Sequence, residues 1–357
     1  MKFTHLLAGF DTIECAYYLR ADGNAGFIFP MLAVEKERLQ QAKSKAPKVI
    51  KLGTEEFLLS SRGTGSGFPF LLENELFRIQ CGELNKPNFF VTYSSYALWH
   101  YEAGTLNRRF LTWAHSVGYI PYRPESLSRL DLTFDYQIDE IDFDEDSFVS
   151  QASKDAQYRK DGKVQTFQFG SGDVVLRIYN KCDEIAEQSN KTWLFPIWGT
   201  EHNVWRIEWQ TRKPILKRFG IRTFDDLSER QGDILRYLVK EHTKLAISSA
   251  DTNRSRWNIH PLWEDLQNRI EMINGLGVYR ECDPQARLAE REMRVAISLY
   301  GYAKRLGAIH SLQRGYSEIG LDQVTERMAI LMHRVHDEFA WKVDIQQRID
   351  EMRVGKS

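Results

Sequence analysis

The segment VVLRIYNK, at residues 174–181, places a tyrosine between two cations. In a β-strand the side chains alternate between two faces, so Arg177, Tyr179 and Lys181 would share one face and the intervening apolar residues the other. A tyrosine phenol has a pKa of about 10 and is a poor nucleophile at neutral pH, but nearby positive charge favours the phenolate. This pattern therefore predicts a strand face that could bind phosphate and activate a tyrosine.

Two further segments alternate in the same way, RLDLTFDY at 129–136 and WRIEWQ at 205–210. Each begins its polar face with an arginine. The polar faces would carry Arg129, Asp131, Thr133 and Asp135 in the first segment and Arg206, Glu208 and Gln210 in the second. Neighbouring strands lie about 4.8 Å apart, so in one sheet the carboxylates would cluster near Tyr179.

Such a cluster of carboxylates repels itself unless protons, arginines or a cation compensate. We therefore predict a site for Mg²⁺ or Mn²⁺ formed by Asp131, Asp135 and Glu208, since hard divalent ions prefer oxygen ligands. A metal ion, arginines that hold phosphate and a tyrosine nucleophile are the parts needed to transesterify a phosphodiester. The same alternation also occurs in ordinary antiparallel sheets with one charged face, where cross-strand pairs contribute roughly 0.2–1 kcal/mol each.

The three segments together resemble the Rep_trans group, also called the replication initiation factor family. This family includes initiators of rolling-circle replication in plasmids and filamentous phages, and related relaxases. The resemblance rests on FGSGDVVLRIYNK (169–181) and VWRIEWQTRK (204–213), with RLDLTFDY upstream, and it covers roughly residues 125–215. Many members have a longer turn after the Gly-Ser pair and a glutamate where Asn180 stands.

The resemblance implies a metal-dependent enzyme that nicks and religates one DNA strand at a replication origin. The tyrosine would keep the 5′ phosphate, and the free 3′ hydroxyl would prime synthesis. By position, Tyr179 matches the catalytic tyrosine, and the acidic residues of the predicted metal site match the acidic positions. The basic positions around the phosphate are matched by Arg129, Arg177, Lys181 and Arg206. DNA, a second copy of the chain, and a host helicase and polymerase would be the partners.

The chain has 357 residues, of which 42% are hydrophobic, and its formal net charge is −1. A chain of this length suggests two domains. Strand patterns dominate residues 1–215, and apolar residues at helical spacing dominate residues 216–357. The predicted fold is α+β, with a curved antiparallel sheet that carries the active site and a mostly helical C-terminal region. Residues 1–215 would be the nicking domain, and residues 216–357 would serve DNA recognition or self-association.

Several other functions lack support in the sequence. The nine histidines form no His–hydrophobe–His triplet, HExxH is absent, and RGTGSG at 62–67 is not followed by the lysine of a P-loop. The four scattered cysteines favour a reducing compartment, and no apolar run approaches 18 residues, so we predict a cytoplasmic protein. Three alternatives stay open: a relaxase with the same chemistry, a DNA-binding regulator without catalysis, and a carboxylate hydrolase unrelated to DNA.

Overall fold

The structure is a computed structural model, and it describes residues 2–23, 28–43, 47–160, 163–275 and 284–353. Contacts divide the chain into unit 1, Met1–Glu281, and unit 2, Cys282–Ser357. The division does not fall at residue 215, where the composition changes. The reason is that the helices directly after residue 215 bury their apolar sides against the sheet, so they belong to unit 1.

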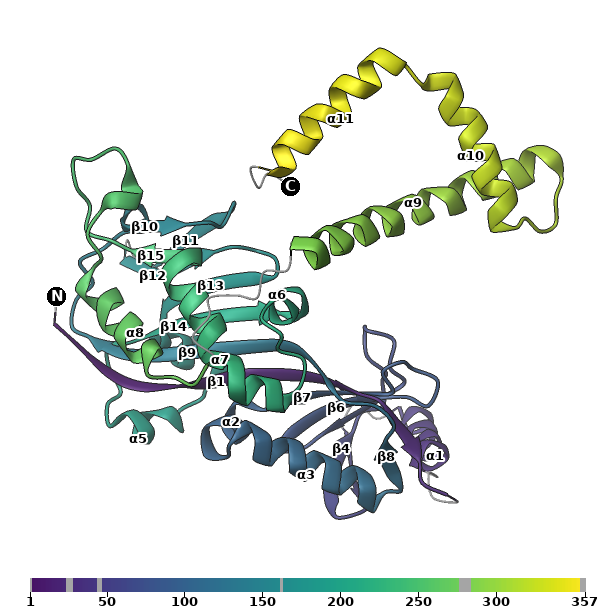
Figure 1. Cartoon of the computed structure of the whole chain (residues 1–357). Helices are drawn as coiled ribbons and strands as arrows, with labels where there is room; N and C mark the ends of the chain where they lie inside the picture. The colour runs from purple at the N-terminus through teal and green to yellow at the C-terminus, as the bar shows by residue number, and fades with distance from the viewer. Residues whose placement is uncertain (1, 24–27, 44–46, 161–162, 276–283, 354–357) are drawn as a thin grey trace. The chain divides into compact units, whose positions relative to one another are not determined.

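A large antiparallel sheet forms the centre of unit 1 (Figure 1). Its strand order among the described residues is β11-β12-β13-β14-β9-β1-β7-β6-β5-β4-β3. The bounds are β1 Phe3–Tyr17, β3 Lys48–Leu52, β4 Glu55–Leu59, β5 Phe70–Glu73, β6 Phe77–Cys81, β7 Phe89–Tyr93, β9 Ser126–Ile138, β11 Asp155–Lys160, β12 Lys163–Phe169, β13 Val174–Asn180 and β14 Val204–Arg212. Two small sheets pair β2 (Leu19–Ala21) with β8 (Tyr119–Pro121) and β10 (Phe148–Ser150) with β15 (Thr243–Leu245).

The three strands singled out by their alternating pattern are neighbours in this sheet, in the order β13-β14-β9. Their apolar residues face one continuous core. Leu176, Ile207 and Leu132 are all nearly inaccessible to solvent in that core. The α+β class and the antiparallel sheet are thereby confirmed.

Helices cover the apolar face of the sheet. They are α1 (Ile28–Gln41), α3 (Ala103–Ser116), α6 (Lys213–Arg218), α7 (Phe224–Tyr237) and α8 (Pro261–Glu271). Trp263 of α8 packs edge-on against Trp209 of β14, and Trp113 of α3 packs against Phe57 and Phe89. In α3 the apolar residues recur at helical spacing, and all of them lie in this core.

The opposite face of β13, β14 and β9 carries the polar side chains. Over its end pack α4 (Lys181–Glu184), the π-helical turn η2 (Ile185–Ser189) and α5 (Leu194–Trp198). A second apolar cluster of Ile185, Leu194, Trp198 and Val204 holds them there. In Figure 1, α5 lies on the other side of the sheet from α7 and α8.

Two sequence expectations differ from the structure. NFFVTYSSYALW at 88–99 is rich in β-branched and aromatic residues, which favours a strand, but the chain leaves β7 after Tyr93 and forms α2, Ser95–His100. Ser94 ends the strand because its hydroxyl accepts a hydrogen bond from the backbone of Ala97 and caps the helix. The segment 154–163 has loop composition but contains β11, whose exposed edge position tolerates polar residues.

Strands β12 and β13 form a hairpin, and the Gly-Ser-Gly-Asp turn joins them. Gly170 has a φ of +90°, and a Cβ there would lie 2.3 Å from the carbonyl oxygen of Val174. Only glycine fits this position, so the turn that directs β13 depends on it.

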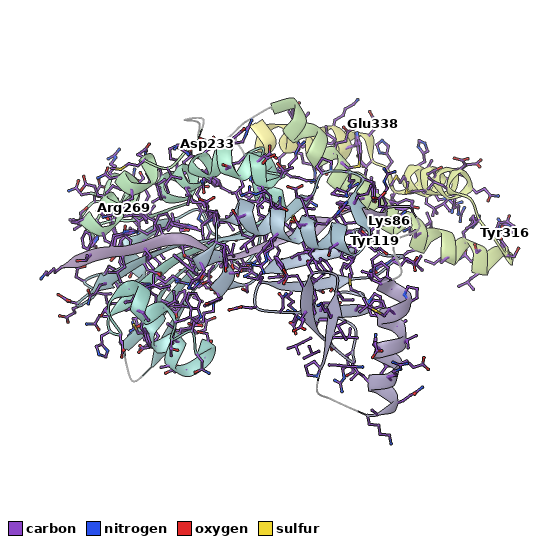
Figure 2. All side chains as sticks on the ribbon, turned by 90° about the horizontal axis from the view of Figure 1, so that it is seen from below. Lys86, Tyr119, Asp233, Arg269, Tyr316 and Glu338 are labelled. Carbon is purple, nitrogen blue, oxygen red and sulfur yellow. The ribbon has the colours of Figure 1, made fainter. Side chains whose placement is uncertain are left out.

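Unit 2 contains α9 (Pro284–Arg314), α10 (Leu321–Val335) and α11 (Glu338–Arg353). Helices α9 and α10 pack together where Ala303 and Val324 are buried, and a Cβ at Gly307 would lie only 3.0 Å from Val324. Tyr316, in the segment between these helices, contacts the ring of His310 (Figure 2). Within the described residues, no helix is both long enough and apolar enough to cross a membrane.

Acid is expected to destabilise unit 1 through His242, at the end of the π-helical turn η3 (Leu238–His242). Burial lowers the pKa of His242 to about 4, and its side chain is only 7% exposed. The unfolded chain binds this proton near pH 6.5, so the stabilisation is present above that pH and is lost as pH falls toward 4. The loss should amount to about 3 kcal/mol. Urea unfolding between pH 7 and pH 4 measures it. In His242→Gln the pH dependence should shrink, and an equally steep dependence would contradict the assignment.

Candidate active site on the polar face of the sheet

The register of the three strands places the predicted residues in rows. Tyr179 of β13, Arg206 of β14 and Asp135 of β9 are cross-strand partners. Two residues further along the same strands, Arg177 of β13 lies opposite Glu208 of β14. The sequence pattern therefore located this face correctly, and the hydrogen bonds show what each side chain does.

Tyr179 is hydrogen-bonded to a carboxylate. Its phenol oxygen donates to Oε2 of Glu208 at 2.9 Å, while Nη1 of Arg177 lies 3.3 Å from Oε1 of the same side chain. Burial, and then the charge of Glu208, raise the pKa of Tyr179 well above its usual value. This differs from the sequence expectation of a phenolate favoured by cations, because the nearest charge is negative. A nucleophilic role for Tyr179 would require a proton acceptor, and the carboxylate of Glu208 is in place to be one.

Glu208 is a better base than an ordinary glutamate. Burial, and then the charges of Asp11 and Asp131, raise the pKa of its carboxyl. Asp131 is similar, since burial raises its pKa even though Arg129 holds both its oxygens, at 2.8 and 2.6 Å. Glu208, which is hydrogen-bonded to Tyr179, and Asp131 are thus two buried carboxylates that favour uptake of a proton or a cation.

Arg206 does not project toward a ligand. Its side chain is fully buried and donates to both oxygens of Asp135, at 2.7 and 2.8 Å, and to Asp11 at 2.6 Å. The indole of Trp198 donates to the same Asp135 at 2.9 Å. With these partners, Arg206 and Asp135 form a buried ion pair that supports the strands. The sequence had suggested instead that Arg206 contacts phosphate and that Asp135 binds a metal ion.

The other two predicted cations, Lys181 and Arg177, flank Tyr179 in the sequence. Lys181 is the first residue of α4, and its amine lies 5.4 Å from the centre of the Tyr179 ring and 2.6 Å from Glu184. Burial, and then the charge of Arg206, lower the pKa of Lys181. The strand ends here because the side chain of Asn180 caps α4. Arg177 reaches Gln168 as well as Glu208 and stays partly exposed.

The predicted three-carboxylate metal site is not assembled. Among the residues that the structure describes, no group of three or more histidines, cysteines, aspartates and glutamates is placed to hold a metal ion. Asp135 does not fit such a role, because its carboxylate is fully buried and is held by Arg206 and Trp198. Asp131 and Glu208 also have partners on both oxygens, but the arginines that hold them, Arg129 and Arg177, are partly exposed and can turn aside for a cation.

Several residues of the site carried no signal in the sequence. Asp11, in the long strand β1, accepts hydrogen bonds from Arg206, Lys191 and Ser95, which come from three separate segments. Burial alone would raise the pKa of Asp11, but the charges of Arg206 and Lys191 hold it far below its usual range. Only the alternation of β1 with its bulge near residue 11 brings this carboxylate to the polar face.

A pocket of about 520 Å³ gives access to Tyr179. Arg177, Glu208 and the side chains of β11 and β12, including Arg159, line one part of it. Acidic residues also line this pocket, with Asp183 and Glu184 of α4 and Glu187 of η2. The pocket therefore combines the cations Arg159 and Arg177 with several carboxylates beside the Tyr179 phenol.

Comparison with known proteins gives one structural likeness to report. No family model matches the sequence, and no curated protein matches it. Among solved structures, the chain is similar to a rolling circle replication initiator protein from Geobacillus stearothermophilus. The TM-score is 0.43 and the sequence identity 16%, over 76% of this chain and 98% of that chain.

Proposed function

We propose that this chain is a rolling-circle replication initiator that nicks and rejoins one DNA strand through Tyr179. The observation that carries the proposal is the hydrogen bond from the Tyr179 phenol to the buried Glu208 carboxylate, in a pocket that also contains Arg177. A tyrosine paired with a base beside an anion-binding arginine is suited to attack on phosphorus. The sequence resemblance over residues 125–215 supplies DNA as the substrate.

In the proposed reaction, the Tyr179 oxygen attacks phosphorus while Glu208 takes the phenol proton. The bond from phosphorus to the 3′ oxygen breaks, and this oxygen takes up a proton to become a free hydroxyl. The 5′ phosphate stays on Tyr179. Arg177 and Lys181 stabilise the charge on the phosphate oxygens. Rejoining is the reverse, with Glu208 returning the proton.

We also propose Mg²⁺ or Mn²⁺ as a cofactor, with Asp131 and Oε1 of Glu208 as its ligands and without Asp135, since Oε2 of Glu208 is the oxygen that accepts the phenol proton. When bound, the ion would supply positive charge to the phosphate oxygens. We expect Mn²⁺ to raise the yield of covalent adduct and to stabilise the wild-type chain against heat, and Asp131→Asn to lose both effects. Thermal melting with and without the ion is the measurement. Equal stabilisation of Asp131→Asn would argue against this ligand.

Glu208→Gln is expected to slow nicking by roughly 10²–10⁴-fold, because the amide keeps the shape but cannot accept the phenol proton. The measurement is the rate of covalent adduct formation on supercoiled plasmid that carries the element's own origin. Asp183→Asn is the matched control, since it removes a carboxylate from the same pocket without touching the hydrogen bond to Tyr179. Equal losses in the two variants would show that the charge of the pocket, rather than a base, is what matters.

A DNA-binding regulator would bind the plasmid without nicking it, and a carboxylate hydrolase unrelated to DNA would do neither. An initiator and a relaxase share this chemistry, so the proposal extends to a relaxase if the plasmid is nicked only at a transfer origin.

A homodimer, in which a second Tyr179 ends the cycle, and a host helicase and polymerase belong to the same proposal. We also propose that the protein acts in the cytoplasm, where its DNA substrate is.

A further inference from the structure

Helix α2 carries a stack of aromatic rings outside the main core. Tyr96 and His100 are one helical turn apart, so their rings lie on one side of the helix, with centres 4.1 Å apart and planes 31° from parallel. Trp193, which precedes α5, sets its edge against the Tyr96 ring at 5.5 Å and lies tilted against the His100 ring at 5.9 Å. The Nδ1–H of His100 donates to the carbonyl oxygen of Tyr96, which fixes the orientation of the imidazole.

Both segments that carry this stack are tied to the candidate active site. Ser95, beside Tyr96, donates to Asp11 at 2.8 Å, and Lys191, two residues before Trp193, binds the other oxygen of Asp11 at 3.0 Å. Asp11 in turn binds Arg206, the cross-strand partner of Tyr179. One carboxylate therefore fixes the aromatic stack relative to the strand that carries the tyrosine.

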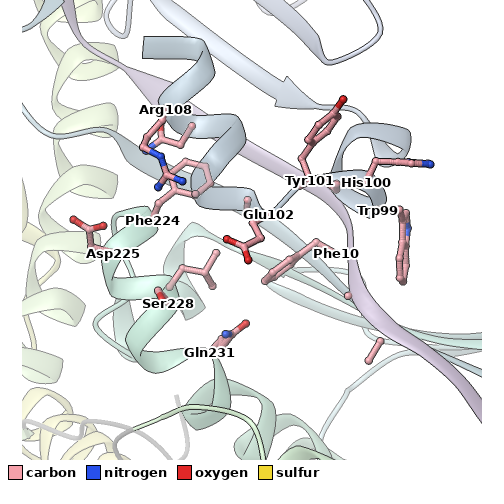
Figure 3. Close-up of a pocket in the computed structure, with 17 residues that line it drawn as sticks. Phe10, Trp99, His100, Tyr101, Glu102, Arg108, Phe224, Asp225, Ser228 and Gln231 are labelled. Carbon is pink, nitrogen blue, oxygen red and sulfur yellow. The ribbon is translucent and has the colours of Figure 1, made fainter. Parts of the chain in front are cut away.

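The stack ends at the surface. His100 is exposed, and it lines a groove of about 820 Å³ between α2, α3 and α7 (Figure 3). Trp99 and Phe10 line the same groove, and the indole nitrogen of Trp99 is buried without a hydrogen-bond partner among the described residues. Gly9 permits this arrangement, because a Cβ there would lie 3.1 Å from the Trp99 ring. The imidazole of His100 is thus the solvent-accessible end of the stack.

We propose that the Tyr96–His100–Trp193 stack binds unpaired bases of the DNA strand that is cut at Tyr179. Aromatic faces bind bases of any sequence by stacking, and nicking requires the strand to be unpaired next to the scissile phosphate. The inference rests on the proposed function, and it names the part of the substrate that this surface holds. The connection through Asp11 and Arg206 keeps the stacked base in register with the reacting phosphate.

The experiment measures binding of a fluorescein-labelled, 20-nucleotide single strand of mixed sequence to the full chain, by anisotropy at fixed salt. His100→Ala should weaken binding about tenfold, the lower part of the range for removing one stacking ring. His100→Phe, which keeps a planar ring, should retain near wild-type affinity. His115→Ala is the matched control, since His115 is also exposed and also lies in the last turn of its helix.

The outcomes separate the inference from the function on which it rests. Equal affinity of His100→Ala and wild type would overturn the stacking surface and leave Tyr179 chemistry in place. An equal loss on the same oligonucleotide annealed to its complement would also overturn it, because bases in a duplex cannot stack on a side chain. Failure of the wild type to bind single-stranded DNA, together with failure to nick plasmid, would overturn the proposed function itself.

Discussion

Tyr179→Phe is expected to abolish the covalent protein–DNA adduct and to lower nicking by at least about 10³-fold, because the variant lacks the attacking oxygen. The phenyl ring fills the same space, so the free energy of unfolding should change by only about 1 kcal/mol, the value of one hydrogen bond. The measurement is adduct formation on origin plasmid with Mn²⁺, followed on a denaturing gel.

The control is Tyr158→Phe. Tyr158 lines the same pocket and is 56% exposed on β11, so it is the competing nucleophile on geometric grounds. Within the part of the chain that the structure describes, Tyr158 makes no hydrogen bond to a buried carboxylate, and we expect Tyr158→Phe to keep the adduct. If Tyr179→Phe still forms the adduct and Tyr158→Phe does not, the nucleophile has been assigned to the wrong strand.

Asp135→Ala is expected to cost about 3–5 kcal/mol of stability, because it leaves the guanidinium of Arg206 buried with only Asp11 as its countercharge. Asp131→Ala should cost far less, about 1 kcal/mol, since Arg129 is partly exposed and can turn to water. Urea unfolding of the full chain with each substitution measures the difference.

Comparing the two variants distinguishes Asp135, whose carboxylate supports the fold, from Asp131, whose carboxylate we propose takes part in the reaction. Asp131→Ala should keep its fold and lose nicking, whereas Asp135→Ala should lose stability first. Similar unfolding midpoints for the two variants would mean that the Arg206–Asp135 pair is not the buried support described above. The double replacement Arg206→Met with Asp135→Leu should recover part of the loss, because apolar side chains of similar volume need no countercharge.

The sequence by itself determined the local structure of the site. Alternation of apolar and polar residues in 129–136, 174–181 and 205–210 identified three strands and the face that each exposes, because the period of two follows from strand geometry alone. The same alternation placed Tyr179 and Glu208 on the polar faces of their strands, and the structure joins these two side chains in a hydrogen bond.

Only the tertiary structure decided what each charge on that face does. The sequence pattern treated Asp131, Asp135 and Glu208 as equivalent, yet Trp198 and Arg206 both donate hydrogen bonds to Asp135. The pattern also gave no sign of Asp11, which is 120 or more residues away in sequence and binds Arg206. The aromatic stack of α2 with Trp193 was equally beyond reach, since a segment that reads as a strand became a helix at Ser94. The partner of each side chain depends on which distant segments of the chain pack together, and the periodicity within a strand carries no information about such tertiary contacts.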